Sequence, residues 1–97
     1  MIDLTLLPQN SRLPLGRLLL TATVLQKVPS LDIARALVRH AKGDWGDVCP
    51  EDRDCNEYAL KTGLRVLSAY HDRFGVKFWI ITEADRSSTT IMLPDDH

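Results

Sequence analysis

The chain has 97 residues and a formal net charge of -1, with 44% apolar and 26% charged residues. This is the size and composition of one small soluble domain, and no apolar run approaches the roughly 20 residues that a membrane-spanning helix needs. The first residues include an acid and lack the basic start and cleavage site of a signal peptide. We therefore expect a cytoplasmic protein that forms a single domain over residues 1–97.

Charge is unevenly distributed along the chain. Residues 1–42 hold six bases against two acids, a local charge of +4, whereas residues 43–57 hold six acids against one base, a local charge of -5. The acids of this acidic segment are Asp44, Asp47, Glu51, Asp52, Asp54 and Glu57. Such asymmetry bears on binding and solubility rather than on fold.

The first half of the chain predicts an irregular arm, an apolar run and a helix. Residues 1–15 contain two prolines and predict an irregular N-terminal arm. Residues 16–24 fit a strand buried on both faces, although a short apolar run is ambiguous between strand and helix. Residues 30–41 predict a helix, because Ser30 can cap its start and Gly43 follows its end. One face of this helix carries its apolar positions, namely Ile33, Ala36, Leu37, His40 and Ala41.

The second half predicts one more helix and then strands. Pro50 suits the first position of a helix over residues 50–61, and Gly63 suits its end. Its least polar side, which we expect to be buried, carries Cys55, Tyr58, Ala59 and Thr62. From residue 64 the pattern becomes alternating and predicts strands over 64–70, 76–83 and 88–93. The expected fold class is α+β, a small antiparallel β-meander of about three to four strands with two main helices packed on one face.

Some residue types could support chemistry. Cys49, Cys55, His40 and His71 are the ligand types of a structural zinc, but their spacing is not that of a zinc knuckle, so we predict no metal and no cofactor. His40 lies on the apolar helix face, which favours a structural role. The alternative is a small hydrolase or nucleotide-modifying enzyme that uses His40, Asp44, Asp47 and Arg86.

Two features favour a binding protein. Trp45, in a loop with glycines on either side, either packs inward or projects as an anchor for a partner. The turn around Asp85 and Arg86 either is closed by local side-chain bonds or recognises an anion. The candidate binding residues are therefore Asp44, Trp45, Asp47, Glu51, Asp54, Asp85 and Arg86.

Several segments resemble a known family. They are residues 39–41, 43–47, 56–57 and 67–70, and above all the block from Trp79 to Pro94, which reads Trp-Ile-Ile-Thr-Glu-Ala-Asp-Arg-Ser-Ser-Thr-Thr-Ile-Met-Leu-Pro. Over about residues 16–94 the chain resembles small proteins from bacterial plasmids, integrative elements and phages, some of which carry a type I restriction subunit label. The chain ends in Asp95, Asp96 and His97 where that family has an acid and then a tyrosine. The resemblance implies a mobile-element setting.

The sequence and this resemblance together favour a non-enzymatic accessory protein of a mobile element. We expect it to inhibit a host nucleic-acid-targeting defence, such as a CRISPR or restriction complex, by protein–protein binding through the acidic segment, with Trp45 as the anchor. Direct nucleic-acid binding is less favoured, because no recognition helix and no aromatic and basic platform is evident.

Overall fold

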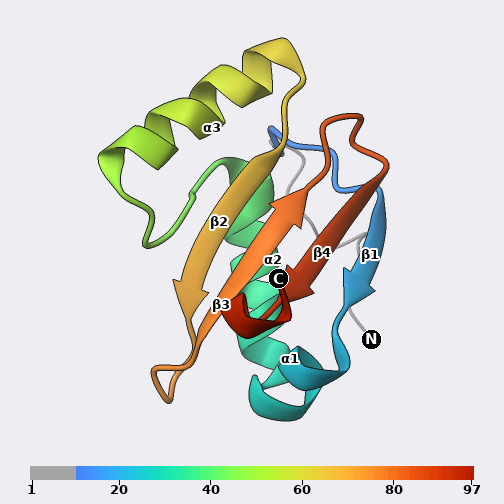
Figure 1. Cartoon of the computed structure of the whole chain (residues 1–97), viewed down its shortest axis with the longest axis vertical. Coiled ribbons are helices and arrows are strands. Elements are labelled where there is room, and N and C mark those ends of the chain that lie inside the picture. The colour runs from blue at the N-terminus through green and yellow to red at the C-terminus, as the bar shows by residue number, and fades with distance from the viewer. Residues whose placement is uncertain (1–10) are drawn as a thin grey trace.

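The computed structural model describes residues 11–97 (Figure 1). Its elements, in chain order, are β1 (Arg17–Leu20), α1 (Ala22–Lys27), α2 (Ser30–Lys42), α3 (Pro50–Thr62), β2 (Val66–His71), β3 (Lys77–Thr82), β4 (Ser88–Met92) and the 3-10 helix η2 (Pro94–Asp96). Helices come before most of the strands, and the fold class is α+β, as predicted. Both long helices have 13 residues. Between residues 11 and 97, no helix is long and apolar enough to cross a membrane.

The four strands form one mixed sheet in the order β1-β4-β3-β2. Strands β2, β3 and β4 make the predicted antiparallel meander, in which Ser68 lies opposite Ile80 and Ile80 lies opposite Ile91. Strand β1 adds to the other side of β4 in parallel, with Arg17 opposite Ser88. The sheet is therefore mixed and not purely antiparallel as predicted. Its parallel strand, β1, comes from the run at residues 16–24, which the sequence left ambiguous between strand and helix.

That run is divided between two elements. Only residues 17–20 form a strand, and helix α1 begins directly after Thr21, whose hydroxyl accepts a hydrogen bond from the backbone N–H of Val24 at 3.2 Å. Strand β1 alternates exposed and half-buried positions, and Leu19 is 39% exposed. The expectation of a strand buried on both faces was wrong, because β1 lies at the edge of the sheet.

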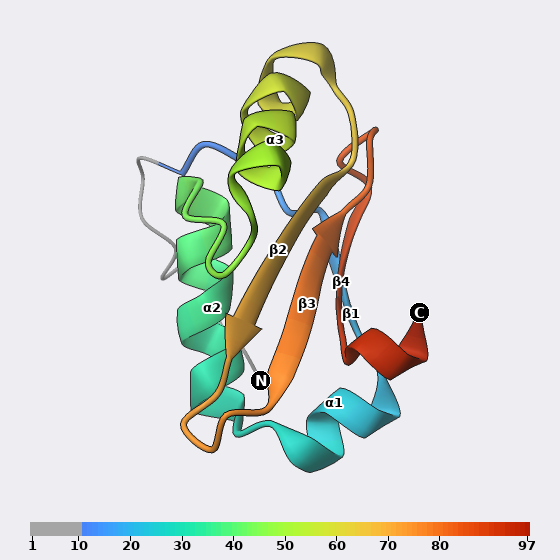
Figure 2. The same ribbon diagram turned by 60° about the vertical axis from the view of Figure 1, so that its left-hand side comes forward.

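Helix α2 and the sheet enclose the core (Figure 2). All five positions of the predicted apolar face of α2 are buried, and Gly43 ends the helix with a left-handed φ of 85°. The irregular residues after the start of the described chain also contribute, since Leu13 and Leu15 are buried. The core facing α2 comes from alternate strand positions, which include Val66, Tyr70, Phe78, Ile80 and Ile91.

Helix α3 lies beside the edge strand β2 (Figure 1). This arrangement does not show the predicted placement of both long helices on one face. The buried residues of α3 are Asn56 and Ala59, whereas Cys55 is exposed and Tyr58 is 62% exposed. The predicted buried side of this helix was therefore wrong except for Ala59.

The orientation of α3 has a physical cause at strand β2. The side-chain amide of Asn56 donates to the carbonyl of Leu67 at 2.8 Å and accepts from the Leu67 N–H at 3.2 Å. Two residues further along, Ala69 donates to the carbonyl of Trp45 at 3.2 Å and accepts from the N–H of Asp47 at 2.7 Å. A buried backbone group without a partner is costly, so these bonds turn the polar Asn56 toward the sheet.

Candidate interaction surface

Two acids of the acidic segment, both in the loop after α2, bind side chains of neighbouring elements. Asp44 accepts two hydrogen bonds from the guanidinium of Arg39, at 2.8 and 3.2 Å. The bonds from Arg39 hold the pKa of the Asp44 carboxyl below its usual range. Asp47 lies 2.8 Å from Nδ1 of His71. Both carboxylates tie the loop after α2 to its neighbours, and the pairing with Arg39 leaves less of the Asp44 charge for a partner.

A third acid, Glu57, holds the indole of Trp45 in place. Trp45 is only 3% exposed, and its Nε1–H donates to Glu57 at 2.9 Å. Arg12 donates to the same carboxylate at 2.7 Å, and these two donors lower the pKa of Glu57. The indole also meets the ring of His40 edge-on, with centroids 5.8 Å apart. Trp45 therefore packs inward, and its predicted role as a projecting anchor is wrong.

The other three acids lie at the start of α3 and form no ion pair with the described residues. Glu51, Asp52 and Asp54 are exposed, and the structure gives none of them an ion pair with any residue from 11 to 97. Only Arg53 supplies a positive charge among them. We call Glu51, Asp52 and Asp54 the acidic end of α3. Because the helix buries only two side chains, it directs these carboxylates into solvent.

Arg86 and Asp85 lie at the opposite end of this helix. The guanidinium of Arg86 donates to the carbonyls of Leu64 at 2.7 Å and Ala59 at 2.9 Å, close to where α3 ends. Asp85 accepts from the backbone N–H of Ser87 at 3.0 Å, which closes the turn. At 1.5 Å per residue a helix of this length spans roughly 20 Å. The structure therefore does not bring these two residues to the acidic end of α3, and Arg86 braces the fold.

His40 lies in a buried chain of hydroxyl groups. Its side chain is 0% exposed, with Nδ1 2.5 Å from the hydroxyl of Ser68 and Nε2 2.8 Å from that of Thr82. Thr82 lies 2.7 Å from Thr89, whose hydroxyl donates to the carbonyl of Leu15. Burial lowers the pKa of His40 to about 3, so the imidazole is neutral near pH 7.

No hydrogen bond or ion pair joins the residues of the enzyme alternative to one another. His40 is enclosed by hydroxyl groups, Asp44 binds Arg39, Asp47 binds His71 and Arg86 binds backbone carbonyls. The two thiols are exposed, which corrects the expectation that Cys55 is buried. No group of three potential metal ligands gathers among residues 11–97, and the absence of bound metal stays a prediction for elemental analysis.

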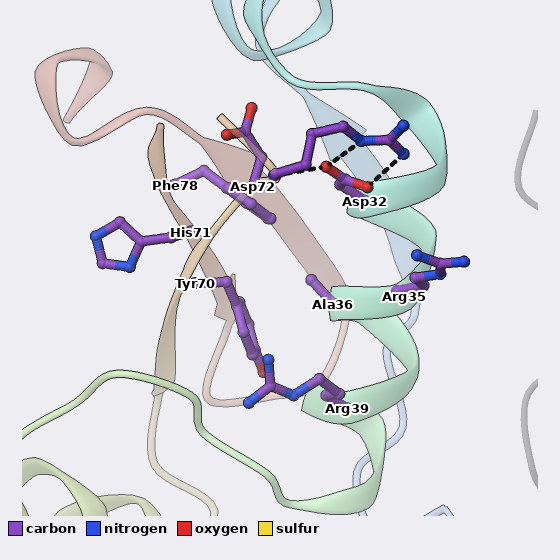
Figure 3. A pocket seen from close by; sticks show the side chains of 9 residues that line it. Asp32, Arg35, Ala36, Arg39, Tyr70, His71, Asp72 and Phe78 are labelled. Atoms are coloured by element: carbon purple, nitrogen blue, oxygen red, sulfur yellow. Dashed lines mark hydrogen bonds and ion pairs between the residues drawn. The ribbon is translucent and has the colours of Figure 1, made fainter. Parts of the chain in front are cut away.

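A first hollow, of about 340 Å³, separates α2 from the hairpin of β2 and β3 (Figure 3). Arg73 crosses it and binds Asp32 through both nitrogens of its fork, at 2.8 and 3.1 Å. These bonds from Arg73 lower the pKa of Asp32 to about 2. The guanidinium of Arg39 lies 4.9 Å from the ring centroid of Tyr70. Two of the three arginines that line this hollow, Arg39 and Arg73, are paired with acids, whereas Arg35 forms no ion pair with any residue from 11 to 97.

A second hollow, of about 360 Å³, lies between α3 and the face of the sheet that points away from α2. We call it the outer hollow. Asp52 and Cys55 line it from α3, and Leu67 and Trp79 line it from the sheet. Sequence reasoning missed this site, although the alternation of Trp79 with the buried Phe78 and Ile80 already placed the indole on the opposite face.

Comparison with protein-family models, with curated proteins and with solved structures gave no match.

Proposed function

We propose that this protein is a non-enzymatic accessory protein of a mobile genetic element that inhibits a host nucleic-acid-targeting defence. In this proposal it binds a protein target, a CRISPR or restriction complex, in the host cytoplasm. The observation that carries the proposal is the acidic end of α3, where three exposed carboxylates have no ion pair with the described residues. The mobile-element setting rests on the resemblance of residues 79–94 and on the shorter segments before them.

The chemistry of such targets supports this choice. A channel that holds nucleic acid is lined with lysine and arginine, because it must neutralise phosphates. An exposed acidic helix offers the complementary charge, speeds the encounter with a basic surface and repels nucleic acid itself. Inhibition would then follow from occupation of the channel, with no bond made or broken.

Not all of the predicted acids are suited to a test of binding. Asp44 and Asp47 contribute to the fold through Arg39 and His71, so their removal would disturb the loop as well as the surface charge. Glu51 and Asp54 are exposed positions on α3 whose charge can be changed with less structural effect. They are therefore the acids to test.

The first experiment measures protection of a targeted plasmid in hosts that carry one CRISPR or restriction system at a time. A system that the protein inhibits is then purified, and its affinity for the protein is measured. The double variant Glu51→Gln/Asp54→Asn is expected to bind about 2- to 30-fold more weakly at low salt, since each exposed charge contact is worth about 0.2–1 kcal/mol. Raising the salt concentration should narrow this difference, because exposed charges are screened over about 8–10 Å.

A matched control removes the same charge elsewhere. Glu83→Gln/Asp95→Asn neutralises two acids that lie outside α3, and it should bind as the unmodified protein does. Equal binding by the unmodified protein and by Glu51→Gln/Asp54→Asn would remove α3 from the mechanism. Equal losses in both double variants would show that only the net charge matters.

A further inference from the structure

The face of the sheet opposite α2 carries apolar side chains. In the register of the sheet, Trp79 lies opposite Met92, and Ile81 lies opposite Leu67. Trp79, Met92 and Leu67 are half-buried, whereas Ile81 is only 1% exposed and is covered within the fold. These positions alternate with the core residues that face α2. Figure 1 looks onto this face, with α2 behind the strands, α3 along the β2 edge, and the short helix η2 with the C-terminal residues in front of part of β3 and β4. An apolar centre bordered by polar groups is the usual anatomy of a protein–protein contact.

The outer hollow lies where this face meets the acidic end of α3. Trp79 forms part of its wall, and the ring of His97 meets the indole edge-on, with centroids 5.8 Å apart and planes at 74°. This is the geometry that pairs of aromatic rings prefer. The Trp79 indole therefore already packs against one flat ring, and a hollow of about 360 Å³ lies beside it.

We propose that the outer hollow takes an aromatic side chain of a partner protein, and that basic residues next to this side chain pair with the acidic end of α3. The inference rests on the proposed function and adds the chemistry of the docking segment. Trp79 and Leu67 supply the ring contact and the apolar surface, and Asp52 lies on the α3 side of the same hollow. Arg65, on the sheet side, can stack on the inserted ring by a cation–π contact.

Charge decides which kind of macromolecule fits. A single-stranded nucleic acid would also stack a base on Trp79, but its phosphates would meet Asp52 in the hollow and Glu51 and Asp54 on the same end of α3, against the single positive charge of Arg65 in the hollow. A basic protein segment gains from the same three carboxylates. The partner segment is therefore an aromatic residue with arginine or lysine neighbours.

The test uses defined peptides and two reporters in the full chain. The peptides are Arg-Arg-Trp-Arg-Arg, Arg-Arg-Ala-Arg-Arg and Glu-Glu-Trp-Glu-Glu, and the oligonucleotide is octathymidylate. One reporter is the indole N–H signal of Trp79 in protein labelled with ¹⁵N. The other is the rate at which iodoacetamide modifies Cys55 in a Cys49→Ser background, because the exposed Cys55 thiol lines the hollow. The basic aromatic peptide is expected to shift the signal, slow the alkylation and bind at least tenfold more tightly than the other three probes.

Variants separate docking from folding. Trp79→Ala should lower the affinity for the basic aromatic peptide about tenfold or more, as expected for the central aromatic residue of a contact. Cys55→Phe fills the hollow from an exposed helix position, so it should block the peptide even if Trp79→Ala proves unstable. Tyr58→Ala is the matched control, because Tyr58 is an exposed aromatic of α3 that does not line the hollow.

Each result has a definite reading. Equal affinity for the peptides with tryptophan and with alanine, tighter binding of octathymidylate, or unhindered peptide binding by Cys55→Phe would overturn the proposal. The defence target distinguishes this failure from failure of the proposed function. If Trp79→Ala retains target binding while Glu51→Gln/Asp54→Asn loses it, the proposed function stands and docking at the hollow is refuted.

Discussion

The buried His40 should make folding stability depend on pH in a narrow and predictable window. Its pKa is lowered to about 3 in the folded protein, from 6.5 as the ordinary value. Between these two pH values the His40 imidazole is protonated in the unfolded chain but neutral in the folded protein. Acidification therefore favours unfolding there, and the folded protein is most stable, with respect to this group, above pH 6.5.

The size of the effect follows from the two pKa values. Well below pH 6.5, each pH unit removes about 1.4 kcal/mol of stability. Integration of the linkage relation from pH 7 to pH 5 gives a loss of about 2 kcal/mol from His40 alone. The carboxyl groups interfere little over this interval, because their ordinary pKa values lie near 4 and their effects fall at lower pH. Domains of this size have about 5–15 kcal/mol of stability, so the loss is measurable.

Urea denaturation at pH 7, 6 and 5 measures this dependence in the unmodified protein and in His40→Gln. Glutamine cannot take up the proton, so the variant should lose less than about 0.5 kcal/mol over the same interval. It should also start about 1–2 kcal/mol less stable at pH 7, because it cannot satisfy both Ser68 and Thr82 as the imidazole does. His97→Gln measures any contribution from the exposed C-terminal histidine. The reasoning is refuted if His40→Gln and the unmodified protein lose the same stability between pH 7 and pH 5.

Three other substitutions test contacts that hold the elements together. Asn56→Ala leaves the N–H and carbonyl of Leu67 without their side-chain partner, and urea denaturation should show a loss of about 1–3 kcal/mol. Arg86→Ala should cost a similar amount and lower the hydrogen-exchange protection at the end of α3, whereas unchanged protection there would contradict its bracing role. Asp32 has a folded pKa of about 2, so its contribution is present above pH 4 and is lost as the pH falls toward 2. Asp32→Asn should remove the part of the acid denaturation that depends on Arg73, as seen in thermal melts from pH 5 to pH 2.

Local signals allowed the two long helices and the meander, but not α1, to be predicted from the sequence. Helix α2 begins at Ser30 and buries its predicted face, because the apolar positions repeat with the helical period and Gly43 supplies a left-handed end. The predicted cap was wrong, because Ser30 is already helical, Pro29 is the N-cap and no side chain caps the helix. Helix α3 begins at Pro50 and ends before Gly63, as its sequence indicates. In each case the deciding contacts lie within the element or next to it.

The errors arise where a distant part of the chain decides. The side of α3 that faces inward depends on Asn56 bonding to Leu67 across the sheet edge, which hydrophobic periodicity does not register. Trp45 packs inward because Glu57, twelve residues later, receives its N–H. Arg86 was a candidate for binding because its place in a turn suggested an exposed charge. The sequence gives no sign that its guanidinium donates to the distant carbonyls of Leu64 and Ala59. These partners become visible only when the elements are placed in space.

The hydrogen bonds along the outer side of β2 govern how this protein can associate with other chains. An open strand edge is a template for strand addition, domain exchange and aggregation. Here the side chain of Asn56 and a few loop residues hydrogen-bond the backbone of β2 at Leu67 and Ala69 without forming a full strand. These bonds hinder the β2 edge from pairing with a strand of another chain. A mutation at Asn56 would therefore do more than lower stability. It would leave the N–H and carbonyl of Leu67 free to pair with a strand of another chain, which favours aggregation.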